Sequence, residues 1–91
     1  MEFEWDREKD LANQRKHGVA FSDAVTVLGD PLAWTIADPD HSEEEYRYLT
    51  TGYSYERKLV IVAHTYVSGR IRIISARPTT RRERQVYEDG D

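Results

Sequence analysis

The most apolar segment of the chain, Leu59–Tyr66 (LVIVAHTY), constrains the fold more than any other. Both of its faces are largely apolar up to His64, a pattern that predicts a central strand buried on both sides. Ser68-Gly69 is a turn signal, and the segment Arg70–Arg77 (RIRIISAR) has the β-branched residues of a returning strand. The sequence therefore predicts a β-hairpin with Leu59–Tyr66 at the middle of a sheet.

The rest of the chain supplies further strands and three helices. Strands are predicted at Phe3–Trp5, Leu32–Ala37 and Tyr46–Tyr53, and helices at Arg7–His17, at Ala24–Leu28 and after Thr79 or Thr80. Asp6 is the predicted N-cap of the first helix and Gly18 its left-handed stop. Leu11 and Ala12 give this helix a narrow apolar stripe that should face the core.

The second and third helices carry start signals of their own. Ser22 or Asp23 is predicted to cap the second helix, and Glu83 completes a capping-box pattern at the start of the third. The order of elements predicts an α+β fold, with an antiparallel sheet of four to five strands, two N-terminal helices and a C-terminal helix. We expect the helices to lie on one face of the sheet.

Length and composition limit what the domain contains. The 91 residues suffice for one domain, residues 1–91, with a single modest core. There is no cysteine and the three histidines are scattered, so neither a disulfide, a metal site nor a cofactor is predicted. No apolar run approaches the roughly 20 residues that cross a bilayer, and the N-terminal segment MEFEWDREKD is too acidic for a signal peptide. We expect a cytoplasmic protein without membrane contact.

Charge is divided unevenly along the chain, although the net charge is only −4. Up to Tyr46 there are twelve Asp and Glu against four Lys and Arg, several of them in a polar loop predicted at Asp38–Glu45. From Arg47 onward there are nine Lys and Arg against five Asp and Glu. Such a division fits two partners, an anionic one at the basic part and a cationic one at the acidic part, or it serves solubility alone.

Six arginines fall within fifteen residues near the C-terminus, namely Arg70, Arg72, Arg77, Arg81, Arg82 and Arg84. Guanidinium groups bind phosphate oxygens bidentately, so a cluster of this density suits a phosphodiester-binding surface. The alternative is a solvated surface whose arginines pair with the many carboxylates of the chain. Strict alternation would place Arg77 opposite Arg70 and Arg72, whereas a β-bulge near Ile73-Ile74 would bring all three to one face.

Four short segments carry a common signature. The first contains Trp5-Asp6, Lys9, Asn13, Lys16-His17-Gly18-Val19, Phe21 and Ala24, and the others are DPDHSEEEYRYLTTG, LVIVAHT and IRIISARPTTRRERQVYE. Together, from Phe3 to Glu88, they resemble the BrnT toxins. The resemblance implies a RelE-like fold and a small microbial ribonuclease, the toxin of a type II toxin–antitoxin pair.

The same resemblance implies the partners. RNA would be the substrate, and a BrnA-like antitoxin with a ribbon-helix-helix part would bind the toxin, so that DNA is contacted only through the antitoxin complex. RelE-like toxins that act at the ribosome tend to be strongly basic. The acidic balance of this chain therefore leaves ribosome dependence open.

RNA cleavage without a metal needs a base, an acid and cations for the charge on the phosphorane. His17 is the acid–base candidate, since an unperturbed imidazole titrates near pH ~6.5, and Lys16 or an arginine would be the charge clamp. Arg77 is the strongest single candidate because it ends the arginine-rich strand, and Arg47 is the second. These four residues form the predicted catalytic set.

The predicted RNA-binding residues are Trp5, Arg70, Arg72, Arg81 and Tyr87. Trp5 could stack on a base or pack beneath the first helix, and Tyr87 could be a general acid, stack on a base or pack against the core. Arg47 could instead form a cross-strand ion pair. His64 fits a buried core histidine better than a catalytic one.

Two classes of function remain open at this level. One is a sequence- or context-selective endoribonuclease that leaves a 2′,3′-cyclic phosphate and is silenced by its antitoxin. The other is a non-catalytic module that binds the antitoxin and acts as co-repressor on operator DNA. A degenerate toxin that keeps the fold with reduced activity is a further possibility.

Overall fold

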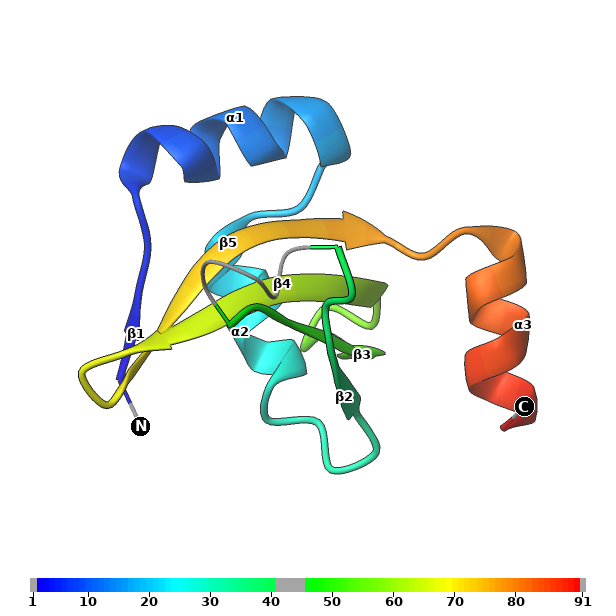
Figure 1. Cartoon of the computed structure of the whole chain (residues 1–91). Coiled ribbons are helices and arrows are strands. Elements are labelled where there is room, and N and C mark those ends of the chain that lie inside the picture. The colour runs from blue at the N-terminus through cyan, green and yellow to red at the C-terminus, as the bar shows by residue number, and fades with distance from the viewer. Residues whose placement is uncertain (1, 41–45, 91) are drawn as a thin grey trace.

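A computed structural model describes residues 2–40 and 46–90 and places them in a five-stranded sheet with three helices (Figure 1). The elements are β1 (Phe3–Glu4), α1 (Arg7–His17), α2 (Phe21–Val27), β2 (Trp34–Ala37), β3 (Tyr48–Tyr53), β4 (Leu59–Val67), β5 (Arg70–Pro78) and α3 (Arg81–Asp89). The strand order is β1-β5-β4-β3-β2, so β4 is central as predicted. Strands β2 to β5 are antiparallel, and the short β1 joins β5 in parallel. The α+β fold class is confirmed, with a sheet that is mixed at one edge.

Two strands begin later than predicted. Leu32 lies outside β2 because its backbone N–H donates to the Asp30 carboxylate at 3.0 Å, which holds it in a turn. Tyr46 lies outside β3, and its carbonyl accepts a hydrogen bond from the Thr65 hydroxyl at 2.7 Å instead of from a strand neighbour. Most of the predicted loop Asp38–Glu45 lies outside the described residues.

The hydrophobic core lies between one face of the sheet and α2. Its buried members are Val19, Phe21, Ala24, Val27, Val60, Val62, Ile71, Ile73 and Ala76. The prediction that Ser22 or Asp23 caps α2 is wrong, because the helix already begins at Phe21. The backbone N–H of Phe21, the first residue of α2, donates to the Asp10 carboxylate at 2.9 Å. A side chain of α1 therefore caps the start of α2.

Helix α1 is attached to the sheet by a polar side chain. Asp6 and Gly18 cap it as predicted, but Leu11 is 43% exposed and the buried residue of this helix is Asn13. The Asn13 amide donates to the carbonyls of Val19 and Ala76, both at 2.8 Å, and accepts from the N–H of Ala76 at 3.1 Å. The amide thus takes the place of a neighbouring strand on the free edge of β5, and the predicted apolar stripe is not what holds α1.

The hairpin of β4 and β5 contains a bulge, which was one of the two alternatives that the sequence left open. His64 pairs with Ile73 and Ala63 pairs with Ser75, which leaves Ile74 as the extra residue. Ile71, Ile73 and Ala76 therefore all face the core. Between the two strands Ser68 and Gly69 both have positive φ, the backbone of a tight hairpin turn.

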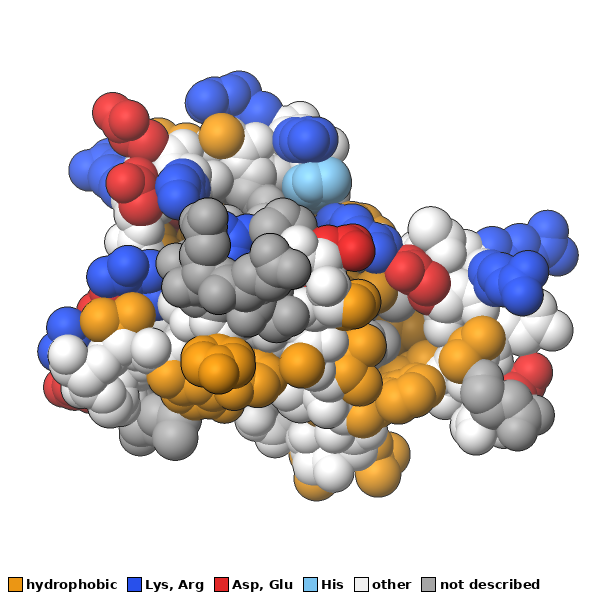
Figure 2. Space-filling model, viewed as in Figure 1, with side chains coloured by type: hydrophobic (Ala, Val, Ile, Leu, Met, Phe, Trp, Pro, Cys, Tyr) orange, Lys and Arg blue, Asp and Glu red, His pale blue; other side chains and the backbone are white. Residues whose placement is uncertain are grey.

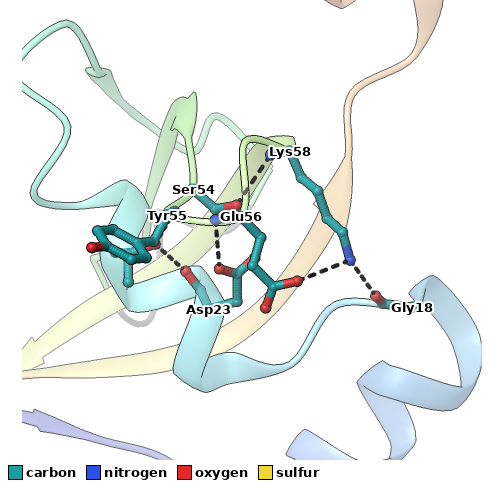
Figure 3. Close-up of polar contacts among 7 residues, drawn as sticks. Gly18, Asp23, Ser54, Tyr55, Glu56 and Lys58 are labelled. Atoms are coloured by element: carbon teal, nitrogen blue, oxygen red, sulfur yellow. Dashed lines mark hydrogen bonds and ion pairs between the residues drawn. The ribbon is translucent and has the colours of Figure 1, made fainter.

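The turn between β3 and β4 forms hydrogen bonds to α2 and to the C-cap residue of α1 (Figure 3). The N–H of Glu56 donates to the Asp23 carboxylate at 3.4 Å, and the N–H of Tyr55 donates to the Thr26 hydroxyl at 2.7 Å. Lys58 reaches the carbonyl of Gly18, at the end of α1, at 3.5 Å. These contacts link the turn of the central hairpin to α2 and to the end of α1.

Helix α3 departs from the expectation that all helices lie on one face. It follows β5 directly and stands apart from both α1 and α2 (Figure 1). Thr80 caps it, and the capping box with Glu83 is formed as predicted. The sheet face opposite α2 therefore has α3 only along one side.

His64 is buried, as predicted, at 1% exposure. Its Nε2 atom shares a hydrogen bond of 2.7 Å with the Thr50 hydroxyl, which in turn contacts the Thr35 hydroxyl at 2.7 Å, so one polar chain crosses β4, β3 and β2. Burial lowers the pKa of His64 from 6.5 to about 4. The neutral imidazole is thus the form that the folded state favours.

We expect the pKa of His64 to make the protein less stable in mild acid. The unfolded chain takes up the proton near its ordinary pKa of ~6.5, so the stabilisation is fully present above that pH and is lost as the pH falls toward about 4. The slope approaches about 1.4 kcal/mol per pH unit. Urea unfolding of the wild type and of His64→Gln across this range measures it, and equal slopes in both proteins would contradict the assignment.

We expect Asn13→Ala to destabilise the protein by roughly 2–4 kcal/mol, because it leaves buried backbone groups of Ala76 and Val19 without partners. Gln14→Ala is the matched control. Its side chain is exposed and donates to Asp10 at 3.2 Å, within its own helix, so a loss of less than about 0.5 kcal/mol is expected. Denaturant unfolding compares the two, and similar losses would show that Asn13 is not the attachment of α1.

Candidate functional site

The candidate site is the sheet face opposite α2, which we call the open face. Because Ile74 is bulged, β5 presents Arg70, Arg72 and Arg77 to this face, in line with Val67, Thr65 and Ile61 of β4. Without the extra residue Arg77 would point into the core. The bulge therefore unites the three strand arginines on one surface, as the sequence allowed.

One carboxylate, that of Glu4, forms ion pairs with two of these arginines. Glu4 of β1 accepts from Arg70 Nε at 2.6 Å and lies 2.7 Å from Arg72 Nη2. Both arginines lower the pKa of Glu4 through these hydrogen bonds, and the pairs are exposed to solvent. The parallel pairing of β1 with β5 creates this contact, since it places Glu4 beside Arg72.

Arg77 forms a bidentate ion pair with Glu83 of α3. Its Nη1 and Nη2 atoms donate to the two carboxylate oxygens at 2.8 and 2.9 Å. Glu83 also accepts from the backbone N–H of Thr80 at 2.8 Å in the capping box. The pKa of Glu83 falls to about 2, first because of Arg77, and the pKa of Arg77 is raised in turn. The carboxylate therefore stays ionised and neutralises Arg77 at any ordinary pH.

Tyr87 attaches α3 to the edge strand β2. Its ring stacks on Trp34 with centroids 5.4 Å apart, and its hydroxyl donates to the carbonyl of Leu32 at 3.0 Å. Nearby, the Tyr53 hydroxyl donates to Glu88 at 2.9 Å, and this carboxylate raises the pKa of Tyr53. In this arrangement Tyr87 is a packing residue, the alternative that the sequence left open, and its RNA-binding role stays a prediction.

Between α3 and the sheet lies a hollow of about 310 Å³, which we call the apolar groove. Its lining residues are Trp34, Ile36, Leu49, Thr51, Ile61, Val86, Arg77, Arg82 and Glu83. Figure 2 shows hydrophobic side chains gathered in this hollow and basic side chains over the start of α3. The groove places apolar surface beside the guanidinium of Arg77.

Lys16 and His17 lie at the C-terminal end of α1. This helix runs beside β5 (Figure 1), and His17 follows Asn13 by one helical turn on the same side. Since Asn13 binds Ala76, His17 is carried toward the end of β5 where Arg77 lies. Within residues 2–40 and 46–90 no hydrogen bond joins His17 to Arg77. His17 is half-buried and Lys16 is exposed.

Arg47 lies immediately before β3, half-buried, with its carbonyl accepting from the N–H of Asp38 at 2.9 Å. The pairing of Tyr48 with His64 places Arg47 next to Thr65 on the open face, in the same row as Arg72. Arg77 belongs to a row at the other end of β5. Arg47 and Arg77 therefore lie at opposite ends of the open face, with the apolar groove nearer Arg77.

Trp5 and Arg72 line a second hollow of about 310 Å³, together with Lys9. The Trp5 ring is 37% exposed and meets Phe21 edge-on at 6.2 Å, so it packs against the core with one part of its surface. Arg81, in contrast, is exposed at the start of α3 with no ion pair in the described part of the chain. The predicted RNA-binding residues thus form separate groups, and their roles stay predictions.

Two features of the site were missed in the sequence. The pairing of Glu4 with Arg70 and Arg72 depends on contacts across the fold. Glu83 lies only six residues after Arg77, and its place as the single acidic residue among the six arginines was the available signal. The apolar groove depends on tertiary structure, and its signal was the alternation in Leu32–Ala37, which puts Trp34 and Ile36 on one face of a strand.

Comparison with known proteins gives one family. The model of the family described as ribonuclease toxin, BrnT, of type II toxin–antitoxin system matches residues 5–83. The crystal structure of the Brucella abortus ribonuclease toxin BrnT has the same fold, with a TM-score of 0.70 at 23% sequence identity, over 89% of this chain and 99% of that one. No curated protein sequence matches the chain. No helix within residues 2–40 and 46–90 is long and apolar enough to cross a membrane.

We expect Glu83→Gln to strengthen the binding of a single-stranded oligonucleotide. Glutamine keeps the capping box but removes the charge that occupies Arg77, so one more phosphate can be neutralised. The slope of log affinity against log salt should steepen by about 0.7. Filter binding or fluorescence anisotropy with a 2′-deoxy oligonucleotide at several salt concentrations measures both quantities.

Glu88→Gln is the control, because it removes the same charge from the same helix without touching Arg77. Equal gains in the two variants would assign the effect to net charge. A loss of binding in Glu83→Gln would mean that Glu83 orients Arg77 for the ligand instead of competing with it.

Proposed function

Because the chain belongs to the BrnT family of ribonuclease toxins of type II toxin–antitoxin systems, we propose that it is an endoribonuclease that cleaves RNA without a metal ion. The nucleophile is the 2′-OH of the substrate, and the products carry a 2′,3′-cyclic phosphate and a 5′-OH. A BrnA-like antitoxin with a ribbon-helix-helix part neutralises it, and DNA is contacted through that complex.

The observation that supports the proposal most is the position of Arg77. It lies at the end of β5 on the open face, held against Glu83 in the geometry with which guanidinium groups bind phosphate. A carboxylate and a phosphate present similar pairs of oxygens to the guanidinium. Arg77 is therefore oriented for bidentate binding of an anion in the free protein, and the RNA phosphate takes the place of the Glu83 carboxylate.

The chemistry requires two proton transfers beside this cation. A base takes the proton from the 2′-OH, the 2′ oxygen bonds to phosphorus, the bond from phosphorus to the 5′ oxygen breaks, and an acid gives its proton to that oxygen. His17 is the candidate for one transfer, because α1 carries it toward the end of β5 where Arg77 lies. Lys16 beside it, and Arg47 at the other end of the open face, add positive charge for the phosphorane and the RNA backbone.

One observation favours the rival function, a non-catalytic module that binds the antitoxin as a co-repressor. All three strand arginines on the open face are paired with carboxylates, Arg70 and Arg72 with Glu4 and Arg77 with Glu83. A surface neutralised in this way attracts RNA more weakly than the sequence suggests. These ion pairs also fit the third possibility, a degenerate toxin that keeps the fold with reduced ribonuclease activity.

We expect the antitoxin-free protein to cleave end-labelled RNA in excess EDTA, with cyclic-phosphate ends on the products. Arg77→Ala should lower the rate about 10²- to 10³-fold through lost charge stabilisation, and His17→Ala about 10²- to 10⁴-fold through lost proton transfer. Arg7→Ala is the control, since it removes an exposed arginine from the opposite end of α1. Gel electrophoresis and phosphatase treatment of the ends read the result.

Equal cleavage by all the variants would point to a contaminating nuclease or to a site elsewhere on the surface. Cleavage that disappears in EDTA and returns with Mg²⁺ would overturn the metal-independent mechanism. If the wild type cuts neither free RNA nor RNA on translating ribosomes, the co-repressor function gains the support that the ribonuclease loses.

A further inference from the structure

The apolar groove is a surface that RNA chemistry leaves unexplained. Of its lining residues, Ile36 is 55% exposed, Trp34 43% and Val86 37%, although they come from different elements, β2 and α3. Apolar side chains from separate elements that gather in one hollow mark an interaction site more often than scattered ones do. In Figure 2 the hollow opens to the surface between α3 and the sheet.

The lining of the groove fits a protein segment better than a nucleobase. Bases bind on free aromatic faces and with hydrogen bonds to their edges. Here four of the lining residues are aliphatic, namely Ile36, Leu49, Ile61 and Val86. The one aromatic ring, that of Trp34, is already stacked on Tyr87. Aliphatic side chains of a partner would find complementary contacts, whereas a base would find few.

The charge around the groove indicates the polar character of that partner. Arg77 and Arg82 line the groove, and Glu83 is engaged by Arg77. Arg81 and Arg82 form no ion pair with another residue of the described chain, so the start of α3 keeps an excess of positive charge. A complementary segment therefore carries Asp or Glu next to its apolar residues.

We propose that the apolar groove is the docking site of an antitoxin segment with aliphatic side chains on one side and carboxylates beside them. This inference rests on the proposed function, in which an antitoxin neutralises the chain. The docked segment covers Arg77, because Arg77 lines the same groove. Binding of the antitoxin and exclusion of the RNA phosphate are then one event at one surface.

The test measures antitoxin affinity separately from RNA cleavage. Ile36→Asp on β2 and Val86→Asp on α3 place a charge in the groove from two different elements, so a folding defect in one leaves the other informative. The probe is a purified BrnA-like antitoxin, the partner in the proposed function, titrated by isothermal calorimetry or surface plasmon resonance. Each variant should weaken its affinity at least tenfold, as loss of a buried interface anchor does.

A matched control is Tyr55→Asp, which changes an 88% exposed aromatic residue in the turn between β3 and β4. It should leave antitoxin affinity unchanged. The two groove variants keep Arg77 and His17, so both should still cleave RNA, and they should continue to cleave it at an antitoxin concentration that silences the wild type. Thermal unfolding confirms that each variant is folded.

Unchanged antitoxin affinity in folded Ile36→Asp and Val86→Asp would overturn the inference. So would weaker binding of a 2′-deoxy oligonucleotide by both variants with antitoxin affinity intact, since the groove would then belong to the RNA site. A wild-type dimer that dissociates in Val86→Asp, again with antitoxin affinity intact, would assign the groove to a second copy of the chain. Failure of the proposed function gives a different result from failure of this inference. In that case the wild type cleaves no RNA, whether or not the antitoxin binds.

Discussion

The β-bulge at Ile74 decides the chemistry of the whole open face. One extra residue in β5 lets Ile71, Ile73 and Ala76 all enter the core while Arg70, Arg72 and Arg77 all leave it. The strand on the far side of the bulge would have a bare edge at Ala76, and the Asn13 amide covers that edge with two hydrogen bonds. The same contact holds α1, and with it His17, against the end of β5. Core, arginine surface and α1 therefore depend on one local irregularity.

The arginines of this surface are balanced by carboxylates that come from the two ends of the chain. Glu4 arrives with the parallel strand β1, and Glu83 arrives with α3. Exposed pairs of this kind contribute little to stability, typically less than about 1 kcal/mol each. Their effect on binding is larger, since every phosphate must compete with a carboxylate already in place. In the proposed function, RNA therefore binds by exchange of anions at arginines that are already oriented.

Helix α3 supplies both a carboxylate that pairs with Arg77 and part of the lining of the apolar groove. It supplies the carboxylate that occupies Arg77, the Val86 side chain that closes the groove and the Tyr87 ring that packs on Trp34. None of its residues is buried, so its attachment rests on these few contacts at the edge of the sheet. Under the two proposals, a partner that binds in the groove meets Arg77, the proposed catalytic arginine, and the helix that neutralises it at the same place. The proposed activity and its proposed control are then neighbours, because both use the end of β5.

The sequence by itself determined the elements, their order and the fold class. The apolar run Leu59–Tyr66 had to be central, Asp6 and Thr80 started helices and Gly18 ended one through local backbone chemistry, and the spacing of the arginines in β5 left a bulge as one of two alternatives. These features depend on residues close in the chain. Tertiary structure alone decided which carboxylate meets which arginine, that Asn13 and not Leu11 is buried in α1, and that Trp34 faces Tyr87 across a groove. The contacts of Glu4, Asn13 and Trp34 join residues more than fifty positions apart, and nothing in the local sequence specifies such a partner. Glu83 lies only six residues after Arg77, but the sequence still left open which carboxylate Arg77 would meet.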